Sequence, residues 1–174
     1  MFFVVNCSKK MKIQFDYVKD ENFSKFSTFD FITVRFRMDK QPNKKQLFEE
    51  IKKAVATQMQ EKGFKKTSEN PDFLIAIHAY RTGTAEGVTD LGYRYANYAR
   101  YWRGDKYWGD GTSIEQIDFK EGTLVIDFVE AKSKEMIWRG VATSSLPPQP
   151  ETEKIKTIAN EAVTKILQHF PPQK

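Results

Sequence analysis

The sequence has little of what disulfide-bonded, zinc-binding and membrane-spanning proteins depend on. It contains one cysteine among 174 residues. A single cysteine excludes an internal disulfide bond and any zinc site built from several cysteines. No apolar run approaches the roughly 20 residues that a membrane-spanning helix needs. We therefore expect a globular chain that does not cross a bilayer.

Catalytic motifs are lacking too, since the two histidines form no Ser-His-Asp or Cys-His spacing and no glycine-rich loop precedes a helix. His78 lies within an apolar strand pattern, where a core histidine is commoner than a catalytic one. Asp127 interrupts another apolar strand, and a hydrogen bond with Arg139 explains it more simply than catalysis. His169 suits a charge interaction at a helix C-terminus. We expect no catalytic residue, metal or cofactor; the alternative, a hydrolase, requires the fold to bring carboxylates or histidines together.

The length of the chain fits one domain, and its net charge does not specify a binding partner. A chain of 174 residues can bury roughly two thirds of its unfolded surface. The net charge of +5 is spread along the sequence. It would help binding to anionic lipid, glycan or nucleic acid but specifies none of them. We expect a leader remnant or tail over residues 1–10 and a single domain over residues 11–170.

Hydrophobic periodicity predicts six strands. Residues 12–17 alternate between apolar and polar side chains, and residues 73–80 are apolar on both faces, which indicates a central strand. In a later strand, alternation places Trp138 on one face with Met136 and Gly140, buried against a helix. The predicted strands lie within residues 11–18, 29–36, 71–80, 114–120, 122–131 and 135–145.

Two segments show the apolar spacing of amphipathic helices, residues 41–64 and 150–170. Asn43 is the predicted N-cap of the first, and Gly63 lies where it ends. Pro150 suits the first turn of the second helix, which ends before Pro171. Two helices and about six strands predict an α+β fold: a two-layer domain with a mixed, mostly antiparallel sheet and both helices on one face.

The segment between two of the strands, residues 83–113, is unusually long and aromatic. Long connections in compact domains are generally functional or disordered, and rings that can pack argue against disorder. The segment either covers the open face of the sheet or extends two strands into a hairpin, or it forms a surface for a glycan or a protein; nucleic acid is the least favoured partner. The predicted binding residues are Tyr93, Tyr95, Tyr98, Tyr101, Trp102, Arg103, Tyr107 and Trp108.

Several short blocks of the sequence occur in a characteristic order along the chain. They include Asp16, Tyr17, Phe23, Ser24, Gly63, Phe64, Pro71, Asp72, residues 122–127 and residues 138–140. With these blocks the chain resembles the domain of unknown function 4136 family of bacterial lipoproteins. The resemblance runs from Cys7 to the last predicted helix, and residues 122–140 are its most specific part. It implies a lipid-anchored envelope protein of Gram-negative bacteria, with no established activity and no catalytic residues.

Cys7 stands where this family carries its lipidated cysteine. Residues 2–5 are then the end of an apolar signal region, although Asn6 is atypical in the position before the cysteine and six residues are too few for a complete signal. We expect a start upstream of Met1; the alternative is a soluble protein in which an edge strand begins at Phe2. Ser8 instead of aspartate after the cysteine favours the outer membrane, with the domain facing the periplasm. An envelope protein or a glycan is then the expected partner.

Overall fold

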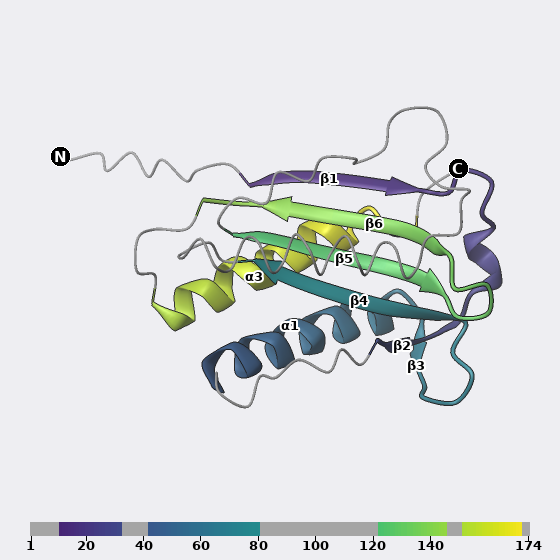
Figure 1. Cartoon of the computed structure of the whole chain (residues 1–174), viewed down its shortest axis with the longest axis horizontal. Helices are drawn as coiled ribbons and strands as arrows, with labels where there is room; N and C mark the ends of the chain where they lie inside the picture. The colour runs from purple at the N-terminus through teal and green to yellow at the C-terminus, as the bar shows by residue number, and fades with distance from the viewer. Residues whose placement is uncertain (1–10, 33–41, 81–121, 146–150, 172–174) are drawn as a thin grey trace.

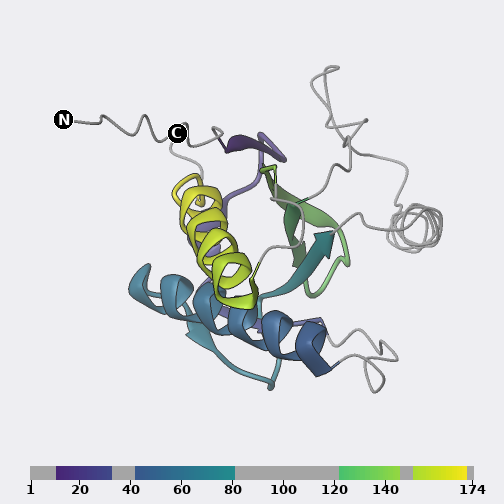
Figure 2. The same ribbon diagram turned by 90° about the vertical axis from the view of Figure 1, so that its left-hand side faces the viewer.

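The computed structural model describes residues 11–32, 42–80, 122–145 and 151–171. They form a six-stranded mixed sheet with two α-helices packed together on one of its faces (Figures 1 and 2), so the predicted α+β, two-layer architecture is confirmed. The elements are β1 (Lys12–Tyr17), the 3-10 helix η1 (Phe23–Lys25), β2 (Thr28–Phe31), α1 (Pro42–Glu61), β3 (Lys65–Lys66), β4 (Phe73–Tyr80), β5 (Thr123–Glu130), β6 (Met136–Thr143) and α3 (Thr152–Leu167).

The strands lie in the order β1-β6-β5-β4-β2-β3. The pairs β1–β6, β6–β5 and β5–β4 are antiparallel, and β2 is parallel to both β4 and β3. β4 lies inside the sheet, as its two apolar faces predicted. The predicted strand 29–36 corresponds to β2, whose last described neighbour is Ile32, while the predicted strand 114–120 lies outside the described residues. The two-residue β3 was not predicted, because two lysines carry no periodic signal.

The core lies between the helices and one face of the sheet. Alternate residues of β5, Leu124, Ile126 and Phe128, face the helices and are buried. Phe128 lies 5.0 Å from the ring of Trp138 and 4.2 Å from the ring of Phe170, measured between ring centroids. Burying large rings in this way supplies much of the free energy of folding, because apolar surface is removed from water.

The helix boundaries correct two predictions and confirm a third. α1 already includes Asn43, so Asn43 is not its N-cap, and α3 begins at Thr152, two residues after Pro150. Gly63 ends α1 as predicted: its φ of 91° places it in the left-handed region that favours glycine. The N–H groups of Gly63 and Phe64 donate to the carbonyls of Gln60 and Met59, which makes a Schellman motif. None of the described helices has the length and apolar character of a membrane span.

A β-bulge changes the predicted face of one core residue. Met136 pairs with Val129 and Trp138 with Phe128, so Ile137 is the extra residue opposite this step of β5. Ile137 and Trp138 both join the core beneath the helices, while Met136 does not. The expectation that Met136 shares a face with Trp138 is therefore wrong, and the burial of Trp138 against the helix side is confirmed.

Candidate functional site

The strongest cluster of chemically active side chains lies on the sheet face opposite the helices. Asp127 of β5 and Arg139 of β6 are cross-strand partners. The Arg139 Nε donates to Oδ1 of Asp127 at 2.6 Å, and Nη2 donates to Oδ2 at 2.9 Å. The Asp127 side chain is fully buried, and that of Arg139 is 7% exposed. The predicted hydrogen bond between these residues is confirmed, as a two-point contact between a planar guanidinium and a carboxylate.

His78 completes this cluster from the neighbouring strand β4. Its Nε2 lies 3.8 Å from Oδ2 of Asp127. Burial lowers the pKa of the imidazole most; the negative charge of Asp127 opposes this effect and the positive charge of Arg139 adds to it. The pKa therefore lies below its ordinary value, and the imidazole is neutral at physiological pH. His78 is a largely buried sheet histidine, as the sequence predicted.

The geometry of this cluster favours a structural role over catalysis. Both carboxylate oxygens of Asp127 accept from Arg139, so the negative charge is neutralised within the fold. A buried ion pair of this kind fixes the register of two strands, because shifting one strand would leave a charge unpaired in a dry environment. Among the described residues, no group of three metal-ligating side chains lies close enough together to hold an ion.

A second polar cluster ties β2 to β4 at the edge of the core. Oδ2 of Asp72 accepts from the backbone N–H and hydroxyl of Ser27 and from the same two groups of Thr28, at distances between 2.8 and 3.2 Å. Burial raises the pKa of Asp72, but these donors together outweigh it, and the pKa lies below its ordinary value. The carboxylate acts as a cap where the two parallel strands begin.

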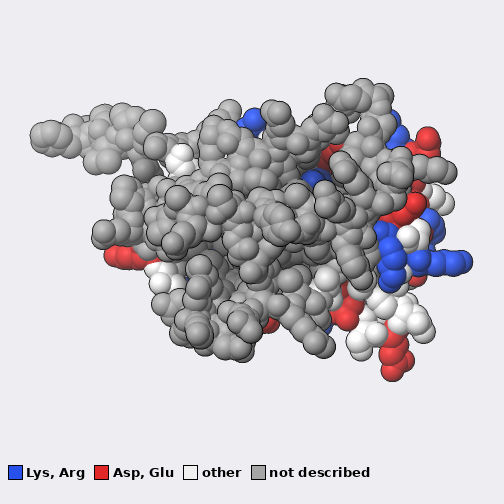
Figure 3. Space-filling model, viewed as in Figure 1, with Lys and Arg blue, Asp and Glu red and all other residues white. Residues whose placement is uncertain are grey.

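A shallow depression of about 490 Å³ lies at the end of β1, beside η1. Its lining includes the aromatic rings of Tyr17, Phe23 and Phe64, and some of its polar groups bond to one another: Asn22, for example, accepts from Ser24. Figure 3 shows basic and acidic side chains interspersed at this end of the molecule, so no single sign of charge marks it. No sequence pattern predicts this depression, because its rings come from separate parts of the chain.

The predicted functional residues themselves lie outside the described residues. This applies to Cys7 and to the aromatic set of Tyr93, Tyr95, Tyr98, Tyr101, Trp102, Arg103, Tyr107 and Trp108. His169 is described: α3 ends at Leu167, so His169 follows the helix instead of lying in its last turn. Its ring stacks on Phe15 of β1, with centroids 4.3 Å apart.

The structure does show where the aromatic segment leaves and re-enters the sheet. Tyr80 at the end of β4 pairs with Thr123 at the start of β5, so residues 81–122 are an insertion of 42 residues within an antiparallel hairpin. The same row continues through Thr143 of β6 to Lys12, the first residue of β1. The roots of the aromatic segment and the strand that follows Cys7 therefore lie at one end of the sheet (Figure 1).

Fold and site together define a two-layer α+β domain with an internally neutralised polar cluster and a long hairpin insertion. The chain belongs to the family described as Domain of unknown function (DUF4136), whose model matches residues 13–172, as the sequence predicted. No curated protein matches the chain in sequence.

Three solved structures are similar to the chain at low sequence identity, and the first of them shares its fold. A PDZ domain protein from Parabacteroides distasonis ATCC 8503 is 16% identical with a TM-score of 0.59, and the match covers 96% of this chain but only 37% of that protein. A PelC dodecamer from Paraburkholderia phytofirmans is 7% identical, with a TM-score of 0.49, over 95% of this chain and 100% of that one. A PelC variant has a TM-score of 0.45 at 7% identity, over 91% and 95% of the two chains.

Proposed function

We propose that this chain is an envelope lipoprotein, anchored to the outer membrane through Cys7, whose domain binds or scaffolds a partner without catalysing a reaction. The observation that carries the proposal is the shared end of the sheet. Cys7 precedes β1 by five residues, and the 42-residue aromatic insertion is rooted in the same row of the sheet as the first residue of β1.

Cys7 lies close in the chain to β1, and β1 lies close in the sheet to β4, where the aromatic insertion begins. Five residues of extended chain span at most roughly 17 Å. Three strand spacings of about 4.8 Å separate β1 from β4, or about 14 Å in all. An anchor at Cys7 would therefore hold this end of the sheet next to the lipid headgroups. The tyrosines, tryptophans and arginines of the insertion would then meet their partner close to the membrane surface.

The non-catalytic part of the proposal is supported by the buried cluster. Asp127, the carboxylate that most resembles a catalytic acid or base, has both oxygens engaged by Arg139. A general acid or base must exchange a proton with substrate, and a fully buried, paired carboxylate is poorly placed for that.

Labelling and fractionation test the anchor. The chain is expressed from its natural locus with its native upstream sequence, labelled with palmitate, and separated into soluble, inner-membrane and outer-membrane fractions. We expect label in the outer-membrane fraction and its complete loss in Cys7→Ser, since a diacyl anchor holds a protein stably in a bilayer. A matched variant, Ser8→Asp, should keep the label and move to the inner membrane in an enteric host. Equal partitioning of the parent and Cys7→Ser would overturn the proposal.

A glycan is the second candidate partner, favoured by the composition of the insertion. Tyr and Trp faces stack on sugar rings, and residues 93–108 contain seven such side chains. Retention of the protein on purified peptidoglycan, compared with retention on envelope protein extract, separates the two candidates.

A further inference from the structure

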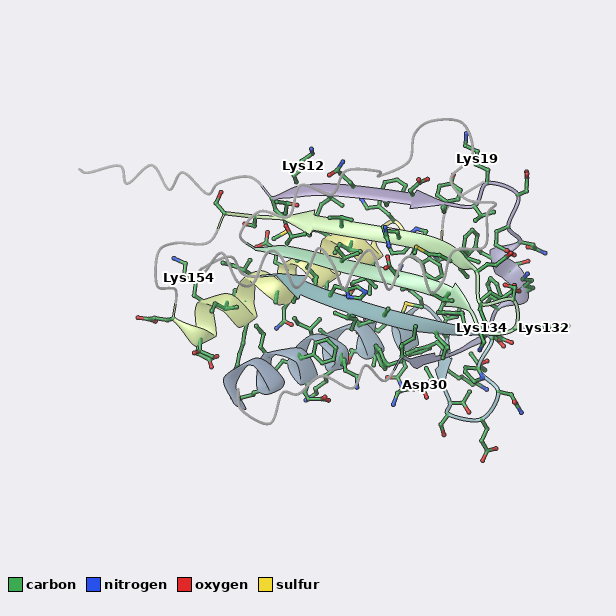
Figure 4. The ribbon with its side chains drawn as sticks, viewed as in Figure 1. Lys12, Lys19, Asp30, Lys132, Lys134 and Lys154 are labelled. Carbon is green, nitrogen blue, oxygen red and sulfur yellow. The ribbon has the colours of Figure 1, made fainter. Side chains whose placement is uncertain are left out.

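The depression beside η1 lies at the end of the sheet away from Cys7. Lys12, the first residue of β1, is close to the cysteine in the chain, whereas Tyr17, the last residue of β1, lines the depression. The strand between them spans about 17 Å. In Figure 4, Lys12 and Lys154 lie toward one end of the molecule and Lys19, which also lines the depression, toward the other. A chain anchored at Cys7 would therefore turn this depression away from the membrane.

Short connections between described elements form the walls of the depression. Residues 18–27 lead from β1 through η1 to β2, residues 62–64 follow α1, and residues 168–171 follow α3. β2, β4 and β6 all run toward the opposite, anchored end, and β1 and β5 start from it. The depression therefore belongs to the end of the sheet opposite the roots of the aromatic insertion.

Ring packing and ion pairs hold these walls in place. Phe23 of η1 packs perpendicular to Phe170, with ring centroids 5.7 Å apart. The ammonium of Lys25, at the end of η1, lies 2.8 Å from Glu21 and 2.9 Å from Glu130 of β5. η1 is thereby tied both to the core and to the sheet. A site that is formed before its ligand arrives loses less conformational entropy on binding.

The lining combines aromatic rings with hydrogen-bonding groups. Tyr17 and Phe23 are only partly buried, so part of each ring is open to a ligand. Oδ1 of Asn22 accepts from the N–H and the hydroxyl of Ser24, which leaves the Asn22 NH₂ group to donate and the Ser24 oxygen to accept. A sugar ring uses both kinds of group, because its C–H face packs on an aromatic ring and its hydroxyls donate and accept hydrogen bonds.

The charges in the lining favour an acidic sugar. Its carboxylate, that of Glu21, is engaged within the fold, since Oε1 accepts from the N–H of Asn22 at 3.0 Å and pairs with Lys25. The lining also contains two cations, Lys19 and Lys62, and Lys62 is exposed just after α1. Although charges of both signs surround the depression, its own lining carries an excess of positive charge. A carboxylate complements that excess.

We propose that this depression binds an acidic saccharide of the cell envelope, with a sugar ring against Tyr17 and Phe23 and a carboxylate at Lys62. A compact ligand fits better than an extended peptide, because Tyr17 alone among the lining residues belongs to a strand. A volume of about 490 Å³ falls within the range of small-ligand sites, roughly 300–1,000 Å³. The inference rests on the proposed envelope location, and it gives the domain a lipid anchor at one end and a glycan at the other.

Two disaccharides that differ by one acidic group test the proposal. The acidic probe is N-acetylglucosaminyl-N-acetylmuramic acid, and the neutral probe is N,N′-diacetylchitobiose, which lacks the lactyl carboxylate. In titration calorimetry, the Cys7→Ser chain should bind the acidic probe at least about tenfold more tightly, an advantage that salt weakens. Equal affinities, or no binding of either probe at millimolar concentration, would overturn the proposal. A tri-glutamate peptide that binds as tightly as the acidic probe would overturn it in favour of an acidic peptide.

Substitutions locate the ligand in the depression. Lys62→Ala should lower the affinity for the acidic probe about tenfold and abolish the preference over the neutral probe. Lys65→Ala is the matched control, because Lys65 is exposed three residues farther on and does not line the depression. Phe23→Leu removes the ring face and should weaken binding of both probes, with urea unfolding as the check that the variant is folded. Equal losses in Lys62→Ala and Lys65→Ala, or unchanged binding by Lys62→Ala and Phe23→Leu, would contradict the site.

The result is independent of the anchor. The Cys7→Ser chain carries no lipid, so a failure to bind the acidic probe leaves palmitate labelling of the natural chain unaffected. Conversely, a chain that is never labelled can still bind the probe. Trp108→Ala, within the aromatic insertion, should bind the acidic probe as the parent does; loss of binding in this variant would place the ligand in the insertion and overturn the proposal.

Discussion

The indole ring of Trp138 occupies the space that a side chain at position 140, two residues farther along β6, would need. A Cβ atom on Gly140 would lie 2.9 Å from Cζ3 of Trp138, and it would also overlap Cη2 of that ring and Cγ2 of Ile166. Glycine at position 140 is therefore what lets the fully buried Trp138 pack beside Ile166 of α3.

Substitutions at these two positions should be coupled. Trp138→Ala should lower the free energy of unfolding by about 3–5 kcal/mol, because it leaves a large cavity. Gly140→Ala should lower it by about 1–3 kcal/mol through overpacking. In the double variant the new methyl group enters the vacated space, so the combined loss should fall short of the sum by more than about 0.5 kcal/mol. Urea unfolding measures all three, and strict additivity would show that the ring does not block position 140.

The Asp127–Arg139 pair should behave as a unit. Arg139→Leu leaves an unpaired buried carboxylate and should cost about 3–5 kcal/mol of stability, while the double variant Asp127→Leu/Arg139→Leu should recover much of that loss. The exposed pair of Lys165 and Glu161 is the control, and Lys165→Ala should cost about 0.5 kcal/mol or less. A double variant no more stable than Arg139→Leu, measured by urea unfolding, would contradict this prediction.

Asp72 should make stability depend on pH in the acid range. Its pKa in the folded protein lies below the ordinary value of 3.8. A lowered carboxyl pKa stabilises the fold fully above the unfolded-state pKa, and this contribution is lost as the pH falls through the folded-state pKa. The stability difference between the parent and Asp72→Asn should therefore be largest near pH 7 and shrink below about pH 4. Asp20→Asn, in the exposed loop after β1, is the control; a difference independent of pH would argue against a charged cap.

Substitutions of Trp102 and Trp108 should have different effects, the first on stability and the second on binding. Trp102 lies among Tyr98, Ala99 and Tyr101, and we expect it to pack on the sheet, so Trp102→Ala should lower stability by several kcal/mol. Trp108 is flanked by Lys106, Gly109 and Asp110, and we expect it to be exposed. Trp108→Ala should then leave stability unchanged and reduce retention on peptidoglycan or on envelope extract.

Denaturant melts of the two single variants and of the double variant, each beside the pull-down, check this prediction. Trp102 is expected to pack on the sheet face opposite the helices. That face is apolar at Val125 and Val141, which are buried. A double variant that unfolds normally and keeps every partner would refute both halves.

The sequence predicted most of the sheet because its signals there are local. The alternation in β1 and the two apolar faces of β4 each depend on neighbouring residues. The Asp127–Arg139 pair depends on two consecutive strands joined by one short turn. The predicted face of Met136 was wrong because a bulge adds one residue to β6. The alternation of apolar and polar residues does not show where such a bulge occurs.

Other features depend on contacts that a linear pattern does not contain. β3 forms because the chain after the cap at Gly63 returns beside β2, which two lysines cannot signal. The four donors on Asp72 come from residues 44 and 45 positions away in the chain. The depression beside η1 likewise gathers rings from β1, from η1 and from the connection between α1 and β3. Helix starts were misplaced by one or two residues, since polar residues near the N-terminus compete for the capping position.

The pairing of β1 with β6 has a consequence for how the protein is made. β1 is the first of the described strands to be synthesised, yet the two paired residues of β1 and β6 that are closest in sequence, Tyr17 and Trp138, are separated by 121 positions. Contacts this distant form late, because a long loop must close before they stabilise anything. Nascent chains thus carry β1 unpaired through most of synthesis, and a chain interrupted before residue 136 never acquires its partner strand. Chaperones that hold extended segments would find their natural target in this first strand.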